Sequence, residues 1–240
     1  MSKTTIPKGG ITADAIDGTL LADNAINSEH YTDGSIDTAH VADSQITLAK
    51  TSGVTGLVKT ANSFNASAVS TLTMDNVFSS SHGIYRVVGY IIPATDGAGI
   101  EMQLRNASSA DLAADGDQYR SMTAGHRITS SSDTVESHTN GDYAAGHWKV
   151  NFGGESNSLD APICFDMMFY DPLQAVVNGK NAHWRVSHVG NDAKHYYHYG
   201  SGTYTTNANA DAAGLRFTMS SGNITRHKVT VYGFQGSTGA

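Results

Sequence analysis

The stretch HYYHYG at residues 195–200 gathers histidine and tyrosine in a way that invites a chemical explanation. On a β-strand, successive side chains point to opposite sides, so Tyr197 and Tyr199 would share one face and Tyr196 and His198 the other. The two histidines of this stretch are three residues apart, whereas two ligands on one face of a strand need an even spacing. We therefore expect no metal here, and the rings remain available for packing or for binding.

Tyrosine and tryptophan can bind sugars, because a ring face contacts C–H groups while the hydroxyl or indole N–H forms a hydrogen bond. The alternative is that such rings pack the interior of the fold or a subunit interface. Five rings are candidates for glycan contacts: Trp148, Trp184, Tyr196, Tyr197 and Tyr199.

Catalytic patterns are missing from the sequence. Asp166 and Asp171 flank the segment MMFY, and Glu101 and Glu155 are scattered, whereas a glycosidase needs two carboxylates held at a set separation. The glycine-containing segments match no phosphate-binding pattern, and no serine or cysteine nucleophile motif is present. We expect a protein that is not an enzyme and that uses no cofactor and no metal.

Nine runs rich in β-branched and aromatic residues predict the strands that would position these side chains. The segment SSGNIT between the last two runs predicts a hairpin turn, and residues 107–147 give no clear prediction. With no predicted helix, we expect a jelly-roll-like antiparallel β-sandwich over residues 63–240. The runs are residues 69–74, 84–92, 99–106, 147–152, 162–170, 183–189, 194–200, 213–221 and 227–234.

The charge and hydrophobicity of the sequence argue against nucleic acid and membrane as partners. The net charge of −7 gives no basic surface for nucleic acid, and no apolar stretch is long enough to insert into a membrane. The first ten residues lack the apolar core of a signal peptide, so we expect folding in a cytoplasm. The single cysteine, Cys164, lies in the apolar run PICFDMMFY and is expected to be a buried small hydrophobe.

The N-terminal fifth of the chain repeats a different pattern, an apolar residue at every fifth position. A helix would turn about 500° over five residues, and a strand would alternate the faces, so neither collects these side chains into one stripe. Asp, Asn, Gly and Ser between them favour a short extended piece followed by a turn. The apolar positions are Ile11, Ile16, Leu21, Ile26, Tyr31, Ile36, Val41 and Ile46.

One chain cannot close a core around a single row of eight side chains, because ordering forty residues costs more than their burial contributes. In three copies intertwined about an axis, every apolar residue would contact the equivalent residues of the two other chains. We therefore expect a homotrimeric β stalk. A flexible polar arm is the alternative. His30 and His40 occupy equivalent places in successive repeats. They would either hydrogen-bond a neighbouring chain or, if they faced the axis, form a ring able to hold a metal or an anion.

The stretch ITADAIDGTLLADNAINSEHYTDGSIDTAHVAD resembles the decapeptide repeats near the amino termini of bacteriophage tail-fibre and other virion fibre proteins, especially those of marine phages. The segments STLTMDNVFSSSHGIYRVV and SSGNITRHKVTVYGF resemble, more loosely, strands in the heads of such proteins. The resemblance implies a trimeric fibre located in the virion, without catalysis.

For this chain the resemblance implies four parts: a virion anchor over 1–10, the stalk over 11–50, a linker over 51–62 and a head over 63–240. The N-terminus would bind other virion proteins of the tail or capsid, and the head would bind a host-surface glycan or protein. A capsid-mounted decoration protein without a receptor is the main alternative. A capsule depolymerase is another, although its usual long β-solenoid does not fit a head of this length.

Overall fold

The computed structural model describes residues 9–12, 21, 26–42, 45, 56–112, 119–128, 135–151, 156–158, 161–173, 180–205 and 211–234. The chain divides into two compact units, residues 1–54 and 55–240. The described part of the first unit contains two short 3-10 helices, and every strand that the structure describes lies in the second unit.

The first unit uses one capped turn twice, ten residues apart. The 3-10 helices η1 (Ser28–His30) and η2 (Thr38–His40) each follow a residue whose side-chain oxygen accepts a backbone hydrogen bond. The histidine closes the turn: His30 Nδ1 lies 2.8 Å from Asn27 Oδ1, and His40 Nδ1 lies 2.8 Å from Asp37 Oδ1. The repeat therefore specifies a local turn, and Nδ1 of both rings is used within its own repeat.

The apolar side chains of the repeat that the structure describes are not packed into a core in the single chain. No strand occurs among its described residues, whereas a turn at Asp33–Gly34 is closed by the Ser35 N–H donating to the Thr32 carbonyl at 2.9 Å. The homotrimeric β stalk stays a prediction. Val41 is half-buried, and Ile16 and Ile46 lie outside the described residues. Five positions are between 40% and 50% exposed in the single chain: Ile11, Leu21, Ile26, Tyr31 and Ile36.

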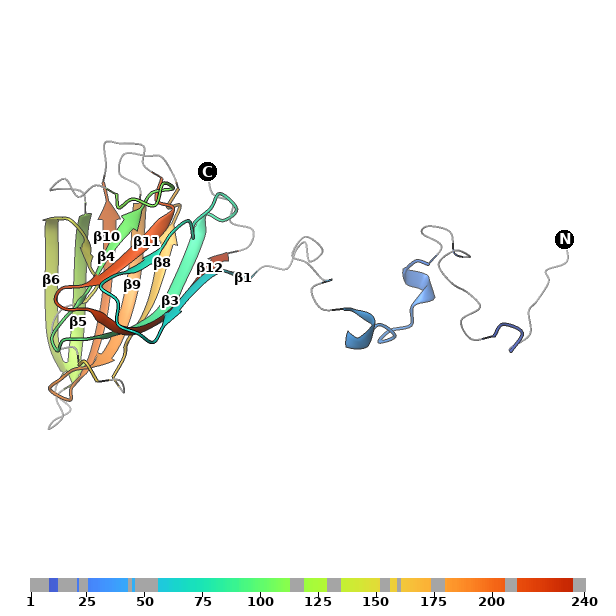
Figure 1. The fold of residues 1–240 in the computed structure, drawn as a ribbon, viewed down its shortest axis with the longest axis horizontal. Helices are drawn as coiled ribbons and strands as arrows, with labels where there is room; N and C mark the ends of the chain where they lie inside the picture. The colour runs from blue at the N-terminus through green and yellow to red at the C-terminus, as the bar shows by residue number, and fades with distance from the viewer. Residues whose placement is uncertain are drawn as a thin grey trace. The chain divides into compact units, whose positions relative to one another are not determined.

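The second unit is an all-β sandwich of two antiparallel sheets, as the sequence predicts (Figure 1). Its strands are β1 (Leu57–Asn65), β2 (Leu72–Met74), β3 (Ile84–Pro93), β4 (Ile100–Arg105), β5 (Tyr119–Ile128), β6 (Val135–Ala145), β7 (Trp148–Lys149), β8 (Ile163–Tyr170), β9 (Lys180–Val189), β10 (His195–Tyr204), β11 (Gly214–Met219) and β12 (Ile224–Phe234). The larger sheet has the order β1-β12-β3-β8-β9-β10-β5-β6, and the smaller has the order β2-β11-β4-β7.

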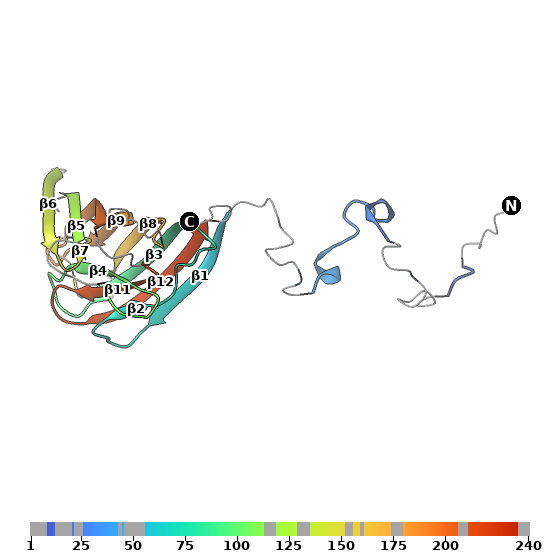
Figure 2. The ribbon, with the colours of Figure 1, turned by 90° about the horizontal axis from the view of Figure 1, so that it is seen from above.

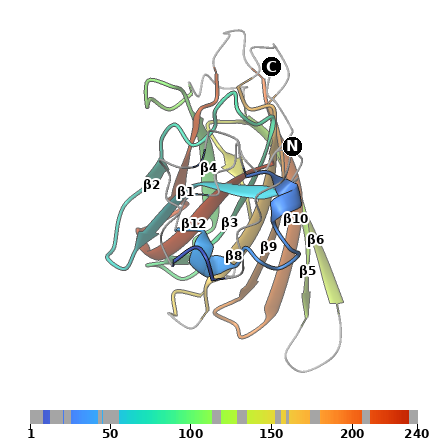
Figure 3. The ribbon, with the colours of Figure 1, turned by 90° about the vertical axis from the view of Figure 1, so that its right-hand side faces the viewer.

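Alternation along the strands gives each sheet one apolar face, and these two faces enclose the core. In β8, Ile163, Phe165, Met167 and Phe169 are buried, while the residues between them are half-buried or exposed. Phe165 stacks across the core on Phe217 of β11, with ring centroids 5.6 Å apart. Figure 2 shows the smaller sheet covering one side of the larger, and in Figure 3 β2 and β4 lie to the left and β9 and β10 to the right. The other side of the larger sheet faces outward.

Two glycines of β10 make room for the tryptophans of the core. A Cβ on Gly200 would lie 2.4 Å from Trp184 Nε1, and a Cβ on Gly202 would lie 2.7 Å from the indole of Trp148. Because real side chains do not pack that closely, only glycine lets both indoles lie this near to the strand.

All nine predicted strands are confirmed, with their ends moved by a few residues. Three strands were not predicted, namely β1, β5 and β6. β5 and β6 lie within residues 107–147, where polar residues and glycines weaken the apolar alternation. β1 pairs with β12 from Leu57 onward, so the sandwich takes in part of the expected linker over residues 51–62.

Two further expectations are wrong. SSGNIT is not a hairpin turn, because β11 pairs with β2 and β4 in the smaller sheet, whereas β12 pairs with β1 and β3 in the larger one. The segment instead carries the chain from one sheet to the other, with Gly222 at φ 71°. Cys164 is exposed rather than buried, because alternation in β8 places it on the outward side.

Candidate functional site

An open depression of about 540 Å³ lies on the outward side of the eight-stranded sheet, over β3, β8, β9, β10 and β5. A volume of this size is in the range of small-ligand sites. We call this surface the outer sheet face. The residues that define it here are Arg86, Met122, Asp166, Tyr170, His183, Arg185 and Tyr199.

Strand register places the charged groups and rings of this face in rows that cross the sheet. One row runs through Val88, Asp166, Arg185, Tyr199 and Ala124, each paired with the next on the neighbouring strand. Because neighbouring strands lie about 4.8 Å apart, the row brings carboxylate, guanidinium and phenol within one ligand's reach. A parallel row contains Arg86 and His183.

Asp166 is engaged within the face by Arg86. Arg86 Nε donates to Asp166 Oδ1 at 2.9 Å, and Nη2 donates to Oδ2 at 2.7 Å. These hydrogen bonds, and then the carboxylate charge, raise the pKa of Arg86 above its usual value. Since both side chains are about 40% exposed, the pair contributes little to stability and mainly fixes two side chains. Each oxygen of Asp166 thereby accepts a hydrogen bond from Arg86.

Arg185 lies across from Asp166 on β9 and is exposed. It has no ion pair with any of the described carboxylates. Its guanidinium therefore keeps its donors for water or for a ligand.

The five predicted glycan contacts separate by burial. Tyr197 and Tyr199 are 44% and 45% exposed on the outward side of β10, with ring centroids 6.4 Å apart. The expectation is wrong for Trp148, Trp184 and Tyr196, which are at most 6% exposed and pack the interior. These three rings fulfil the alternative interpretation.

The three buried rings make their contacts within the core. Trp148 donates from Nε1 to the carbonyl of Thr203 at 3.3 Å, and its ring lies 6.1 Å from that of Trp184. Tyr196 stacks on His188 at 4.9 Å with the rings nearly parallel. Trp184 of β9 and Tyr196 of β10 lie on the inward side of the larger sheet, where the even-numbered residues of these strands point. Trp148 of β7 packs against that side from within the core.

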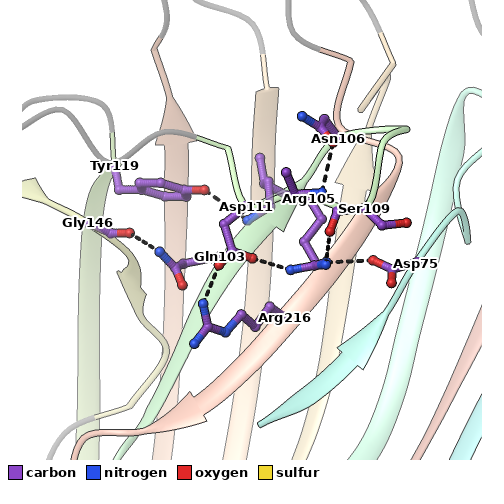
Figure 4. Close-up of polar contacts among 11 residues, drawn as sticks. Asp75, Gln103, Arg105, Asn106, Ser109, Asp111, Tyr119, Gly146 and Arg216 are labelled. Atoms are coloured by element: carbon purple, nitrogen blue, oxygen red, sulfur yellow. Dashed lines mark hydrogen bonds and ion pairs between the residues drawn. The ribbon is translucent and has the colours of Figure 1, made fainter.

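A second polar cluster lies on the outward side of the smaller sheet (Figure 4). Arg105 donates to Asp75, Asp111 and the carbonyl of Ser109, and Arg216 donates to the other oxygen of Asp111. Two arginines face two aspartates, and all four are partnered. This network fastens the loop after β4 to β2 and β11, which is a structural role.

The described members of the scattered acids lie in different surroundings. Asp166 is bound by Arg86 on the larger sheet, and Glu101 lies on β4 of the smaller sheet, 3.2 Å from His147 Nε2. The backbone of Asp171 donates to the carbonyl of Gly83, and Glu155 lies outside the described residues. Within the described ranges, no group of three or more His, Cys, Asp or Glu side chains is placed to hold a metal ion. No helix among those residues is long and apolar enough to span a membrane.

Sequence reasoning missed Arg86, His183 and Arg185 as members of this face. The alternation of the run 183–189 already placed His183 and Arg185 on one side of a strand. What the sequence did not reveal is that β3, β8, β9 and β10 are neighbours in this order.

A scan against protein-family models found no match, nor did searches of curated proteins and of solved structures. Function is therefore inferred from the repeat and from the outer sheet face.

Proposed function

We propose that this protein is a virion fibre of a bacteriophage, in which the N-terminal repeat forms a trimeric stalk and the β-sandwich is a head that attaches to the host cell surface. The protein displays a binding surface and does not catalyse a reaction. The N-terminus docks on other virion proteins.

The repeat carries this proposal. Its described apolar side chains are 40–50% exposed at five positions, although they recur at a fixed step of five residues. A regular row of exposed apolar residues is explained if identical chains cover it, and an isolated tether has no need of the spacing. The resemblance of the repeat to those of virion fibre proteins implies the same arrangement.

The outer sheet face supports the attachment role. Exposed rings and a guanidinium without an ion-pair partner project from rigid strands, and rigid elements hold a binding surface better than loops do. Three identical heads would make weak single contacts effective through avidity.

Adsorption to bacteria tests this function. We expect the fluorescently labelled full chain to bind saturably to some strains of a bacterial panel and to reduce adsorption of the virus to those strains. The double variant Tyr197→Ala/Tyr199→Ala is expected to lower the retained fluorescence at least several-fold. A full chain that binds none of the strains, or whose binding is unchanged in this variant, contradicts attachment through the sandwich.

A further inference from the structure

We propose that the outer sheet face binds an anionic glycan, with Arg185 bound to a carboxylate or phosphate of the polymer and Tyr199 stacked on a neighbouring sugar ring. This inference rests on the proposed attachment function and specifies the class of receptor.

The outward side of the larger sheet differs in charge from the rest of the protein. The whole chain carries a net charge of −7, yet the seven strands β1, β12, β3, β8, β9, β10 and β5 contain a single acidic residue, Asp166. The outward side of the same strands includes Arg86, Arg120, Arg185 and Lys228. After Asp166 is neutralised by Arg86, this side is positive on an otherwise acidic protein, which favours an anionic ligand.

The guanidinium of Arg185 is suited to bind an anionic group. An arginine fork matches the two oxygens of a carboxylate or phosphate, and such bidentate pairs are among the strong hydrogen bonds of proteins. Arg86 already uses its fork on Asp166. Arg185, one strand further on, is exposed and pairs with none of the described acids. It is therefore the guanidinium of the depression that can take a ligand's anionic group without breaking an existing pair.

Aromatic rings lie on both sides of that guanidinium. Tyr199 is the cross-strand neighbour of Arg185, and Tyr197 lies two residues before Tyr199 on the same side of β10. On the other side, Tyr170 meets His183 edge to face, with centroids 5.5 Å apart. The five strands from β3 to β5 span about 19 Å, because four spacings of about 4.8 Å separate them. A chain of several linked sugars fits across this width.

A second copy of this chain is the competing occupant of the face. A copy would present the same positive surface, so like charges would meet if two outer sheet faces packed together. Cys164 provides a direct check, because it is exposed on the outward side of β8. We expect a maleimide reagent to modify Cys164 in the native assembly of the full chain. Protection of this thiol in the native assembly, but not in the denatured chain, would show that protein covers the face and would overturn the inference.

The binding test uses immobilised bacterial capsular polysaccharides, each in its native form and after chemical reduction of its carboxylates to neutral alcohols, together with phosphate-containing and neutral polymers. We expect the full chain to bind acidic polymers and to lose at least tenfold in affinity when the bound polymer is reduced, dephosphorylated or placed in high salt. Arg185→Met should lower affinity at least tenfold. The control Lys194→Met removes the same charge in the β9–β10 turn, where Lys194 pairs with Asp192, and should change affinity less than twofold.

The outcomes separate the receptor class from the attachment function. If the chain adsorbs to cells but binds only neutral polymers or none of the polymers, the anionic-glycan inference is wrong and attachment stands. If binding depends on charge but Arg185→Met behaves like Lys194→Met, the location on the outer sheet face is wrong. If neither cells nor polymers are bound, the proposed function fails as well.

Discussion

At the scale of single residues, His188 shows how the interior constrains the protein's response to acid. It is 3% exposed and stacks on Tyr196, and His198 lies 5.4 Å away. Burial lowers the pKa of His188 to about 4, while its contact with the Val189 backbone and the charge of Asp192 act weakly in the opposite direction. Folding therefore favours the neutral ring.

This shift predicts an acid-dependent loss of stability. Below about pH 6.5 the unfolded chain binds a proton at this histidine, whereas the folded chain does so only near pH 4. Stability from this group is complete above pH 6.5 and is lost as the pH falls toward 4, by roughly 3 kcal/mol. His188→Phe keeps the stacked ring and removes the proton site, so the variant should lose less stability over that range.

Urea unfolding of the wild type and of His188→Phe at several pH values between 4 and 7.5 measures the difference. His227, whose pKa is also lowered by burial, remains in both proteins and cancels in the comparison. Parallel stability curves for the two proteins would show that His188 does not titrate with a lowered pKa.

At the scale of elements, β10 shows what the sequence predicted and what it did not. The alternation in HYYHYG correctly placed Tyr197 and Tyr199 on one side of a strand and Tyr196 and His198 on the other. Which side faces outward depends on the sheet that covers the inner face, and residue order does not specify that partner. The same difficulty applies to Trp148 and Trp184, whose chemistry suits a sugar platform or a core equally well.

The outer sheet face was predictable only in pieces. Asp166 and Arg185 were visible as polar residues within apolar runs, but their meeting requires the antiparallel pairing of β8 with β9. The β5–β6 hairpin was missed because its strands contain glycines and polar residues that weaken the pattern. Pairing with β10 supplies the backbone hydrogen bonds that local propensity does not predict.

The glycine of β10 beneath Trp148 gives a prediction at this scale. In Gly202→Ala the new methyl group would meet the indole at 2.7 Å, so the ring and its hydrogen bond to Thr203 must shift. We expect a loss of about 1–3 kcal/mol in the free energy of unfolding. Gly141→Ala in β6 is the matched control, because its Cβ would have no neighbour within 4 Å.

Thermal unfolding followed by tryptophan fluorescence measures both glycine variants. The Gly202→Ala protein should melt at a lower temperature with an altered native emission, and the Gly141→Ala protein should resemble the wild type. Equal melting of all three would mean that the indole does not lie against Gly202.

At the scale of the whole molecule, the proposed fibre assigns assembly to the repeat and attachment to the β-sandwich. The repeat presents apolar residues that a single chain leaves exposed, and the sandwich closes its own core. This difference predicts that oligomerisation depends on the repeat. Changing Ile26 and Ile36 together to Asp should dissociate the assembly, because buried carboxylates without partners are strongly unfavourable, while the head keeps its strand signal in circular dichroism.

Sedimentation equilibrium of the full chain tests the trimer most directly. We expect a mass of about 76 kDa, three times the chain's 25.3 kDa, falling toward 25.3 kDa for the Ile26→Asp/Ile36→Asp variant. A wild-type monomer of 25.3 kDa whose amides over residues 26–42 are nevertheless protected from hydrogen exchange would contradict the trimeric stalk. The repeat would then be ordered without other copies of the chain.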